Sequence, residues 1–265
     1  MAQKTEEGCS IDELITCFLS RQIEDGDEVG AGAGSAIART AMQLAAMTRC
    51  PNLVVRLGET RTNLLNVGLV EAFKTTNDGR AARWGEYKYT DDEVMLQVRK
   101  ANRSIFTMGG LQVDKYGNCN LIGIGDDPKR LKIRGPGGIG APEMAAHVKF
   151  INIQVGRHDK RTFVEKCDYI SQVGWYKGGD SRKKLGLPGG GPRYVITPLC
   201  IMDFEEDTKR MRLKSVHPGV TVEQVVENTG FELIVPETVP QTEPPTKEEL
   251  EFLRTRIDTE GMLRR

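Results

Sequence analysis

Three separated clusters of glycine give this chain its clearest candidates for chemistry. They comprise Gly30, Gly32 and Gly34, then Gly109 and Gly110, and then Gly135, Gly137, Gly138 and Gly140. A glycine has no Cβ, so its backbone N–H can come close to a ligand, and exposed amides at turns and helix starts bind anions. We therefore expect a negatively charged or oxyanionic substrate at these clusters. The alternative is that each cluster forms only a tight turn.

A glutamate that follows a strand-like run is the second candidate. Residues 53–55 predict a buried strand, and Arg56, Gly58 and Glu59 come directly after it. Open α/β sheets bind ligands at the carboxyl ends of their strands, where a glutamate can attack an acyl group or accept a proton. Glu59 is thus a candidate catalytic residue, and Arg56 and Gly58 are candidates for binding the substrate. The alternatives are an exposed Glu59 beside Arg61 and a surface salt bridge for Arg56.

The sequence lacks the motifs that several other kinds of chemistry require. The chain has no Gly-x-Ser-x-Gly segment and no Walker A lysine loop, and the first glycine cluster has the wrong spacing for a dinucleotide fingerprint. His147, His158 and His217 are scattered, and the six cysteines form no CxxC pair. We therefore expect no metal site, and we interpret the cysteines as buried thiols of a cytoplasmic protein.

Composition narrows the class of partner. The 265 residues contain 37 Lys plus Arg and 37 Asp plus Glu, so no net charge attracts nucleic acid or an anionic membrane. No apolar stretch approaches the length of a membrane span, and the first residues are polar. We expect a cytoplasmic protein that binds its partners through local sites.

The elements that position these candidates follow an α/β pattern. Capping boxes at residues 10–13, 90–93 and 246–249 predict helix starts, and helical spacing predicts helices over 11–23 and 35–49. Strand-like runs come at residues 53–55, 104–108, 150–155, 161–164, 194–197, 200–204 and 211–213. This order predicts an open, mostly parallel sheet flanked by helices.

The last part of the chain has its own character. Prolines make residues 236–245 a stiff, extended linker, and residues 246–258 predict a final helix with Leu250, Leu253 and Ile257 on one face. That face packs either on the core, which we favour, or on a partner subunit. We interpret residues 1–265 as a single domain that includes this linker and helix.

Six stretches in order along the chain resemble the β subunit of family I coenzyme A (CoA) transferases, most closely the glutaconate enzyme. They are residues 101–103 leading to 109–118, and then 135–138, 160–161, 173–175, 185–189 and 227–231. The resemblance implies an open α/β fold of the CoA-transferase type. It also implies CoA as a substrate with no resident cofactor, and an α subunit as partner in a heterodimer or an α2β2 heterotetramer.

The resemblance also implies roles for the candidate residues. In such enzymes a glutamate of the β subunit attacks the acyl-CoA thioester, which gives an anhydride and then a glutamyl-CoA thioester. The Gly-x-Gly-Gly loop forms the oxyanion hole, and it maps to Gly137 and Gly138. The first glycine-rich segment of the family maps to residues 30–34.

The position of the glutamate allows two interpretations. The nucleophile of the glutaconate enzyme aligns with Gly58, and Glu59 stands one residue later. This Gly-Glu register is similar to that of the β subunit of a steroid ring-cleaving hydrolase with the same fold, whose main catalytic glutamate lies on the α subunit. We therefore favour transfer of CoA between carboxylic acids, and keep ring-opening hydrolysis or decarboxylation of a CoA thioester as the alternative.

Overall fold

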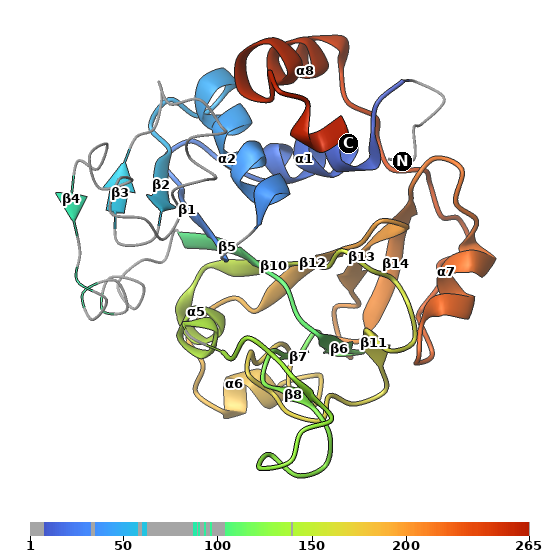
Figure 1. The fold of residues 1–265 in the computed structure, drawn as a ribbon. Helices are drawn as coiled ribbons and strands as arrows, with labels where there is room; N and C mark the ends of the chain where they lie inside the picture. The colour runs from blue at the N-terminus through green and yellow to red at the C-terminus, as the bar shows by residue number, and fades with distance from the viewer. Residues whose placement is uncertain are drawn as a thin grey trace. The chain divides into compact units, whose positions relative to one another are not determined.

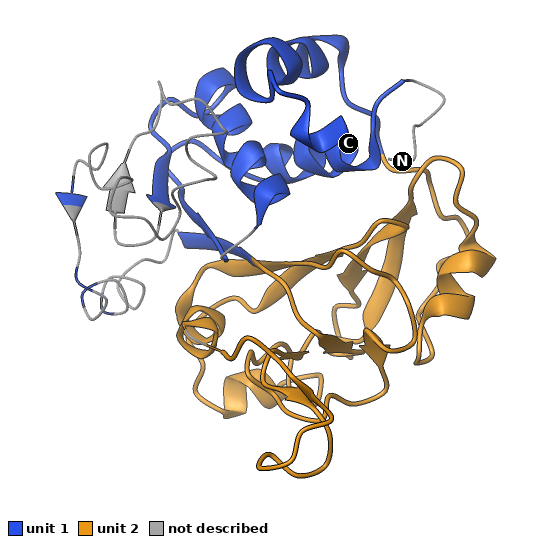
Figure 2. Cartoon of the chain, in the orientation of Figure 1, with its two compact units in different colours: residues 1–107, 243–265 blue, residues 108–242 orange. Residues whose placement is uncertain are grey.

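The computed structural model describes residues 8–32, 35–57, 60–62, 87–88, 90, 93, 96, 104–138 and 140–264. The chain forms two compact units: residues 1–107 with 243–265 make unit 1, and residues 108–242 make unit 2 (Figure 2). The later boundary lies within the predicted linker 236–245. No helix in the described ranges is long and apolar enough to cross a membrane.

Unit 1 is built around β1 (Glu28–Ala31), which has a parallel neighbour on each side. These neighbours are β2 (Val54–Leu57) and β5 (Ser104–Met108). β3 (Thr60–Thr62) and β4 (Tyr87–Lys88) extend the sheet in antiparallel orientation beyond β2. After β1 comes α2 (Ala36–Thr48), which lies within the predicted helix 35–49 (Figure 1).

Both ends of the chain meet in unit 1. The first helix α1 (Ile11–Arg21) begins with the predicted capping box, in which the Ser10 hydroxyl accepts from the Glu13 amide and Glu13 accepts from the Ser10 amide. The last elements are α8 (Lys247–Phe252), η2 (Leu253–Ile257) and η3 (Met262–Arg264). The Ser10 hydroxyl also donates to the Leu263 carbonyl at 2.6 Å.

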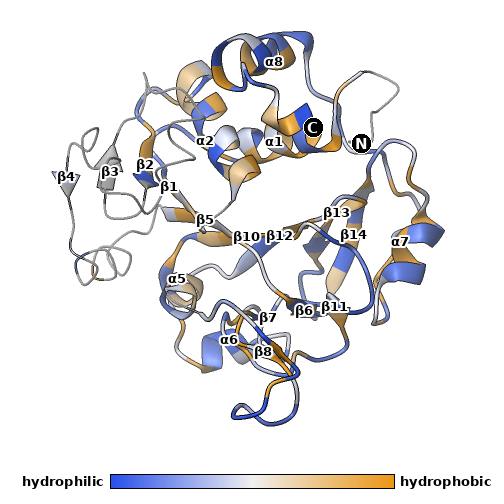
Figure 3. Ribbon diagram, viewed as in Figure 1, coloured by the Kyte–Doolittle hydropathy of each residue, from blue (hydrophilic) through white to orange (hydrophobic). Residues whose placement is uncertain are grey.

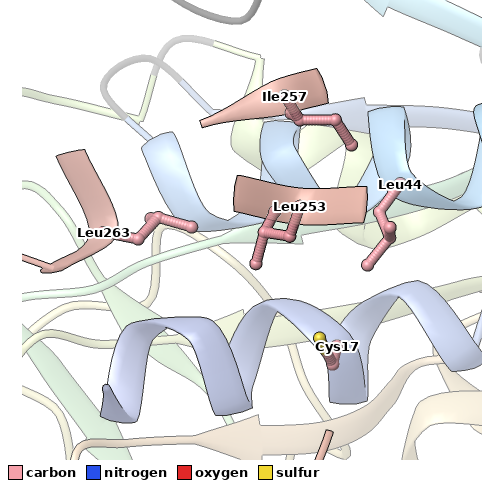
Figure 4. Close-up of a cluster of buried hydrophobic side chains, with 5 residues drawn as sticks. All are labelled: Cys17, Leu44, Leu253, Ile257 and Leu263. Atoms are coloured by element: carbon pink, nitrogen blue, oxygen red, sulfur yellow. The ribbon is translucent and has the colours of Figure 1, made fainter. Parts of the chain in front are cut away.

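The apolar face of the last helix packs on the core of unit 1. Leu253 and Ile257 are buried against Cys17 of α1 and Leu44 of α2, with Leu263 beside them (Figure 4). The prediction that this face packs on the core is therefore confirmed.

A buried carboxylate also joins the first and last helical segments of unit 1 through an ion pair. Arg254 donates two hydrogen bonds to Glu13, at 2.7 and 2.8 Å, and the Glu13 side chain is fully buried. Burial by itself raises the pKa of Glu13, but the hydrogen bonds from Arg254 and the Ser10 amide, with the charges of Arg254 and Arg264, bring that pKa below its ordinary value. Arg21 and Glu249 form a second bidentate pair between α1 and α8.

Unit 2 contains a mixed sheet and two smaller ones (Figure 1). The mixed sheet has the order β14 (Met211–Val216), β13 (Cys200–Phe204), β12 (Pro192–Ile196) and β10 (Phe150–Gln154), and among these four strands the β10–β12 pair is parallel and the others antiparallel. One smaller sheet has the order β11 (Phe163–Val164), β6 (Gln112–Asp114) and β7 (Cys119–Asn120). The other is the hairpin of β8 (Gly123–Ile124) with β9 (Ile133–Arg134). The loop that connects β8 to β9 is hydrophilic (Figure 3). Its helices are α5 (Ala141–His147), α6 (Ser181–Lys184) and α7 (Val222–Asn228). The predicted α/β fold is confirmed, with helices and parallel strands in both units.

Two buried histidines belong to a polar network in unit 2. His158 contacts the hydroxyls of Thr197 and Thr229, at 2.9 and 3.1 Å. His217 contacts the Thr242 hydroxyl and the Thr197 carbonyl, both at 2.9 Å. These partners are neutral, so a proton added to either imidazole would stay uncompensated. Both histidines therefore hold the fold together as neutral side chains.

We expect the Leu253→Ala variant to lose about 2–5 kcal/mol of unfolding free energy, because it leaves a cavity between three helical segments. Urea unfolding of the purified protein measures this loss. Leu250→Ala is the matched control, because Leu250 lies on the same helical segment but is only half-buried. Equal losses for the two variants would contradict the packing described for Leu253.

We expect the free energy of unfolding to fall as the pH is lowered from 7 to 5. Burial lowers the pKa of His158 and of His217 to about 4, against weak opposition from Asp159 for the first and from the Thr197 carbonyl for the second. The unfolded chain binds these protons near pH 6.5 and the folded chain only near pH 4, so the loss is about 2 kcal/mol per histidine by pH 5. Urea unfolding at the two pH values tests this. His217→Gln should remove about half of the pH dependence, and an unchanged dependence would count against the assignment.

Candidate active site

The first glycine cluster serves the sheet of unit 1. Gly30 lies in β1, and a Cβ built on it would come 2.3 Å from the ring of Phe106, so the neighbouring strand requires a glycine there. The Gly32 N–H donates to the Thr107 carbonyl at 3.0 Å. The described amides of this cluster therefore act in strand pairing. Gly34 lies outside the described residues.

Arg56 is held inside unit 1. Its side chain is buried and forms an ion pair with Glu28 on the adjacent strand. A buried pair of this kind is costly to break, because each charge would be left without its partner. Arg56 is therefore fixed at the β1–β2 ladder. Gly58 and Glu59, which follow β2 in the sequence, lie outside the described residues.

The second and third glycine clusters meet in unit 2, on either side of residues 119–122. Leu111, next to Gly110, donates its amide to the Asn120 carbonyl at 2.8 Å. Gly135 donates to the Ile122 carbonyl at 2.8 Å, and a Cβ built on it would come 2.7 Å from Leu111 Cδ1. Two glycine turns that are separate in the sequence are thus brought together around one short segment.

Only some amides of the third cluster are free to bind a ligand. Gly137 has a φ of 90°, which only glycine adopts readily, and its N–H donates to the Leu121 carbonyl at 2.9 Å. The N–H groups of Gly138 and Gly140 donate to no acceptor in the described part of the chain, and neither do those of Gly109 and Gly110. Gly135 and Gly137 therefore anchor the loop, and Gly138 is the amide of the predicted oxyanion pair that remains available.

The segment that supports these turns is fixed by buried amide side chains. Asn120 donates to Gln112 and to the Gly123 carbonyl, and its own oxygen accepts from the amides of Ile122 and Gly123. Its side chain is completely buried and its hydrogen bonds are all internal. The turns before and after Asn120 therefore keep one conformation.

The preceding turn is fixed in the same way. Asp114 accepts from the amides of Tyr116 and Asn118 and from the Asn118 side chain. Burial raises the pKa of Asp114, and these hydrogen bonds partly offset the rise. Gly117 completes this turn with a φ of 68°.

A model of the coenzyme A transferase family matches residues 13–228. The chain belongs to this family. One subunit of 3-oxoadipate CoA-transferase from Pseudomonas knackmussii is 38% identical over 252 residues, which cover 92% of each chain. The CoA-transferase family uses CoA thioesters as substrates, and the free amides of unit 2 are groups that can stabilise an oxyanion.

Two further relatives span almost the whole chain. One subunit of glutaconate CoA-transferase from Acidaminococcus fermentans is 33% identical, over 93% of this chain and 91% of its own length. The crystal structure of glutaconate coenzyme A-transferase from that organism matches with a TM-score of 0.82 and 30% identity, and covers 98% of both chains. The cholesterol ring-cleaving hydrolase IpdB subunit of Mycobacterium tuberculosis is 28% identical, over 94% of this chain and 95% of its own.

Sequence reasoning missed one residue that organises this CoA-transferase chain. Arg182 is buried and forms no ion pair with a described carboxylate. Its guanidinium donates instead to five backbone carbonyls, those of Ala145, Ala146, Val173, Gly174 and Gly189, at 2.5 to 3.5 Å. Burial lowers the pKa of Arg182 to about 10, so it stays charged at neutral pH. It closes the carboxyl end of α5, the helix that begins directly after Gly140.

The remaining reactive side chains serve structure. All six cysteines are free and buried, and burial raises the pKa of Cys17 and Cys200 to about 12. Across the described ranges, no three His, Cys, Asp or Glu side chains are placed to hold a metal ion. His158 and His217 are bound into the network of unit 2. The described candidate site therefore consists of backbone amides of unit 2, and the role of Glu59 stays a prediction.

We expect Gly137→Ala to cost about 1–2 kcal/mol of unfolding free energy, because an L side chain at this left-handed φ is strained. Gly138→Ala is the matched control: its φ is outside that region, and its added Cβ would lie 3.5 Å from Pro142 and Ser171, an ordinary contact. Thermal unfolding of both variants measures the difference. A Gly138→Ala variant that is the less stable of the two would contradict this loop conformation.

Proposed function

We propose that the chain is the β subunit of a heteromeric cytoplasmic enzyme that moves CoA from one carboxylic acid to another. The observation that carries the proposal is the Gly138 amide, which donates to no acceptor among the described residues and lies on a loop that the Gly135 and Gly137 amides anchor. Two relatives that are 38% and 33% identical are subunits of CoA-transferases. The names of these enzymes specify 3-oxoadipate and glutaconate, so we propose a dicarboxylic acid as one substrate.

In the proposed reaction, the Glu59 carboxylate attacks the carbonyl carbon of the acyl-CoA thioester. A C–O bond forms, and the carbonyl electron pair moves onto oxygen; collapse of this intermediate breaks the C–S bond and releases CoA thiolate, which leaves a mixed anhydride. The thiolate then attacks the Glu59 acyl carbon and releases the first acid, which gives a glutamyl-CoA thioester. The second acid then attacks the glutamyl-CoA thioester, which releases CoA thiolate and gives a new mixed anhydride. The thiolate attacks the acyl carbon of the second acid, which gives the new acyl-CoA and frees the Glu59 carboxylate.

The amides of unit 2 stabilise the oxyanion in these steps. We assign the main role to Gly138, because the Gly137 N–H is already bound to Leu121. Gly137 contributes the backbone conformation that presents the next amide, and Gly135 and Gly140 bound the loop. A single donor of this kind is worth roughly 10²- to 10³-fold in rate.

Binding of CoA involves the remaining predicted residues. Gly109 and Gly110 offer free amides to the thioester or its pantetheine amides. Gly34 and Gly58 stay predicted contacts to the ligand, whereas Gly30 and Gly32 serve the strand pairing of unit 1 and Arg56 is paired with Glu28. The enzyme needs no resident cofactor in this scheme, since CoA is itself a substrate.

The partner is an α subunit of the same family, in a heterodimer or an α2β2 heterotetramer. The relatives are named as subunits, and the glutaconate enzyme is matched along 98% of its chain. The partner completes the pocket for the acyl group.

A second candidate function is hydrolysis of a carbon–carbon bond, or decarboxylation, in a CoA thioester. The 28% identity to a subunit of a ring-cleaving hydrolase over 94% of the chain favours it. Glu59 would then orient substrate or water, while a carboxylate of the α subunit moves the proton. Gly138 would stabilise an enolate in place of the tetrahedral oxyanion.

We expect Glu59 to be trapped as a thioester when the αβ complex is incubated with glutaconyl-CoA or another acyl-CoA and then reduced with borohydride. The reduction converts the carboxyl group to a primary alcohol, which mass spectrometry locates in the peptide. Glu59→Gln should lower CoA transfer on the order of 10³-fold or more, because no nucleophile remains. Glu227→Gln, at an exposed carboxylate on α7, is the control and should keep full activity.

The same experiment separates the two functions. Absence of a reduced Glu59, together with ring opening or CO2 release from a CoA thioester, would replace transfer by the second candidate. Full transfer activity in Glu59→Gln would remove Glu59 from the mechanism.

A further inference from the structure

Ser171 lies directly against the glycine loop of unit 2. Its side chain is buried, and a Cβ built on Gly138 would come 3.5 Å from the Ser171 Cβ. The Ser171 hydroxyl accepts from the Leu121 amide at 2.9 Å and donates to the Cys119 carbonyl at 3.2 Å. One hydroxyl thus contacts both ends of a short segment that the loop depends on.

The Leu121 peptide connects this hydroxyl to the loop. Its N–H is bound by Ser171, and its carbonyl accepts the Gly137 N–H at 2.9 Å. The orientation of Leu121 therefore sets the position of Gly137 and, through the next peptide, the direction of the Gly138 amide. A shift at Ser171 passes to the oxyanion donor through two hydrogen bonds.

The hydroxyl is not needed to hold its own segment in place. The backbone of that segment is already paired with Cys119: the Cys119 amide donates to the Gln172 carbonyl at 2.9 Å, and the amides of Ser171 and Gln172 both donate to the Cys119 carbonyl at 3.0 and 3.1 Å. These bonds remain when the hydroxyl is removed. What the hydroxyl alone supplies is the acceptor for the Leu121 amide.

We infer that Ser171 is a positioning residue that sets the geometry of the Gly138 oxyanion donor. The inference rests on the proposed function, because it assigns the supporting residue of the same oxyanion site. Ser171 acts through Leu121 and Gly137 and takes no part in the bonds that are made or broken. A donor moved by about 1 Å costs on the order of 10²-fold in rate, so a small rotation of Leu121 has a measurable effect.

Ser181 provides a matched control within the same unit. Its hydroxyl also accepts from a backbone amide, that of Lys177 at 3.0 Å, and donates to a backbone carbonyl, that of Trp175 at 2.9 Å. Both of these partners lie outside the two glycine turns. Ser181→Ala therefore removes the same two kinds of hydrogen bond without reaching the loop.

The test compares Ser171→Ala with Ser181→Ala in the complete αβ complex. We expect Ser171→Ala to lower kcat for CoA transfer roughly 10- to 100-fold with KM changed less than about twofold, because the donor acts on the transition state more than on the bound substrate. Hydrogen exchange of the peptide that covers residues 135–140 should become faster, since the Gly137 bond to Leu121 weakens. Ser181→Ala should change neither measurement.

The outcomes separate this inference from the proposed function. A wild-type complex without CoA transfer would overturn the proposed function, whereas the exchange of residues 135–140 would still test the control of the loop by Ser171. The inference is overturned if Ser171→Ala keeps kcat close to that of Ser181→Ala, or if its exchange rises equally throughout unit 2.

Discussion

A single buried guanidinium organises unit 2. Arg182 stays charged at neutral pH although no described carboxylate pairs with it, and taking such a charge out of water is costly. The cost is offset only while backbone carbonyls of α5 and of residues 173, 174 and 189 converge on it. These segments are therefore tied to one another. Since α5 begins where the glycine loop ends, the last residue of the loop leads into a helix that Arg182 holds in place.

The glycine turns illustrate how a site made of backbone is assembled. A free N–H group cannot be oriented by a rotamer, so its direction depends on the hydrogen bonds of the peptides beside it. In the third cluster, the amides of Gly135 and Gly137 donate to carbonyls of residues 121–122. These hydrogen bonds hold the loop in the conformation that leaves the Gly138 amide available. The buried side chains of Asn120 and Asp114 keep that supporting segment rigid. Most of the polar atoms here hold the scaffold, and few remain for a ligand.

Local patterns in the sequence predicted what local contacts decide. The capping boxes at Ser10 and Thr246 were predictable because each joins groups three residues apart. The runs at residues 53–55, 104–108, 150–155 and 200–204 predicted strands correctly, since each has buried apolar side chains. The short strands β8 and β9 were not predicted, and both residues of β9 are exposed. The sequence predicted that the glycine clusters lie at a ligand, but not that Gly110 and Gly135 lie around one segment. The hydrogen bonds that bring these two turns together join residues that are distant in the sequence. A contact between residues distant in the sequence also explains Gly30, because the ring of Phe106 occupies the place of a Cβ. No local sequence pattern predicts this contact.

Charged residues show the same limit. Arg182 begins a run of three basic residues whose other members, Lys183 and Lys184, are exposed. Such a run indicates a solvated surface, so the buried member of it could not be distinguished. The place of Arg56 near the site stays a prediction, and its pairing with Glu28 was not predictable, because that ion pair joins two strands that are separated by a helix in the sequence.

The joining of both chain ends in unit 1 has a consequence for biosynthesis. Helix α1 is synthesised before its partners, because Glu13 pairs with Arg254 and the Ser10 hydroxyl donates to the Leu263 carbonyl. Unit 2 is continuous from residue 108 to residue 242 and is synthesised between the two parts of unit 1. Unit 1 therefore stays incomplete until residues 243–265 have been made, and until then Cys17 of α1 and Leu44 of α2 lack their contacts with Leu253 and Ile257.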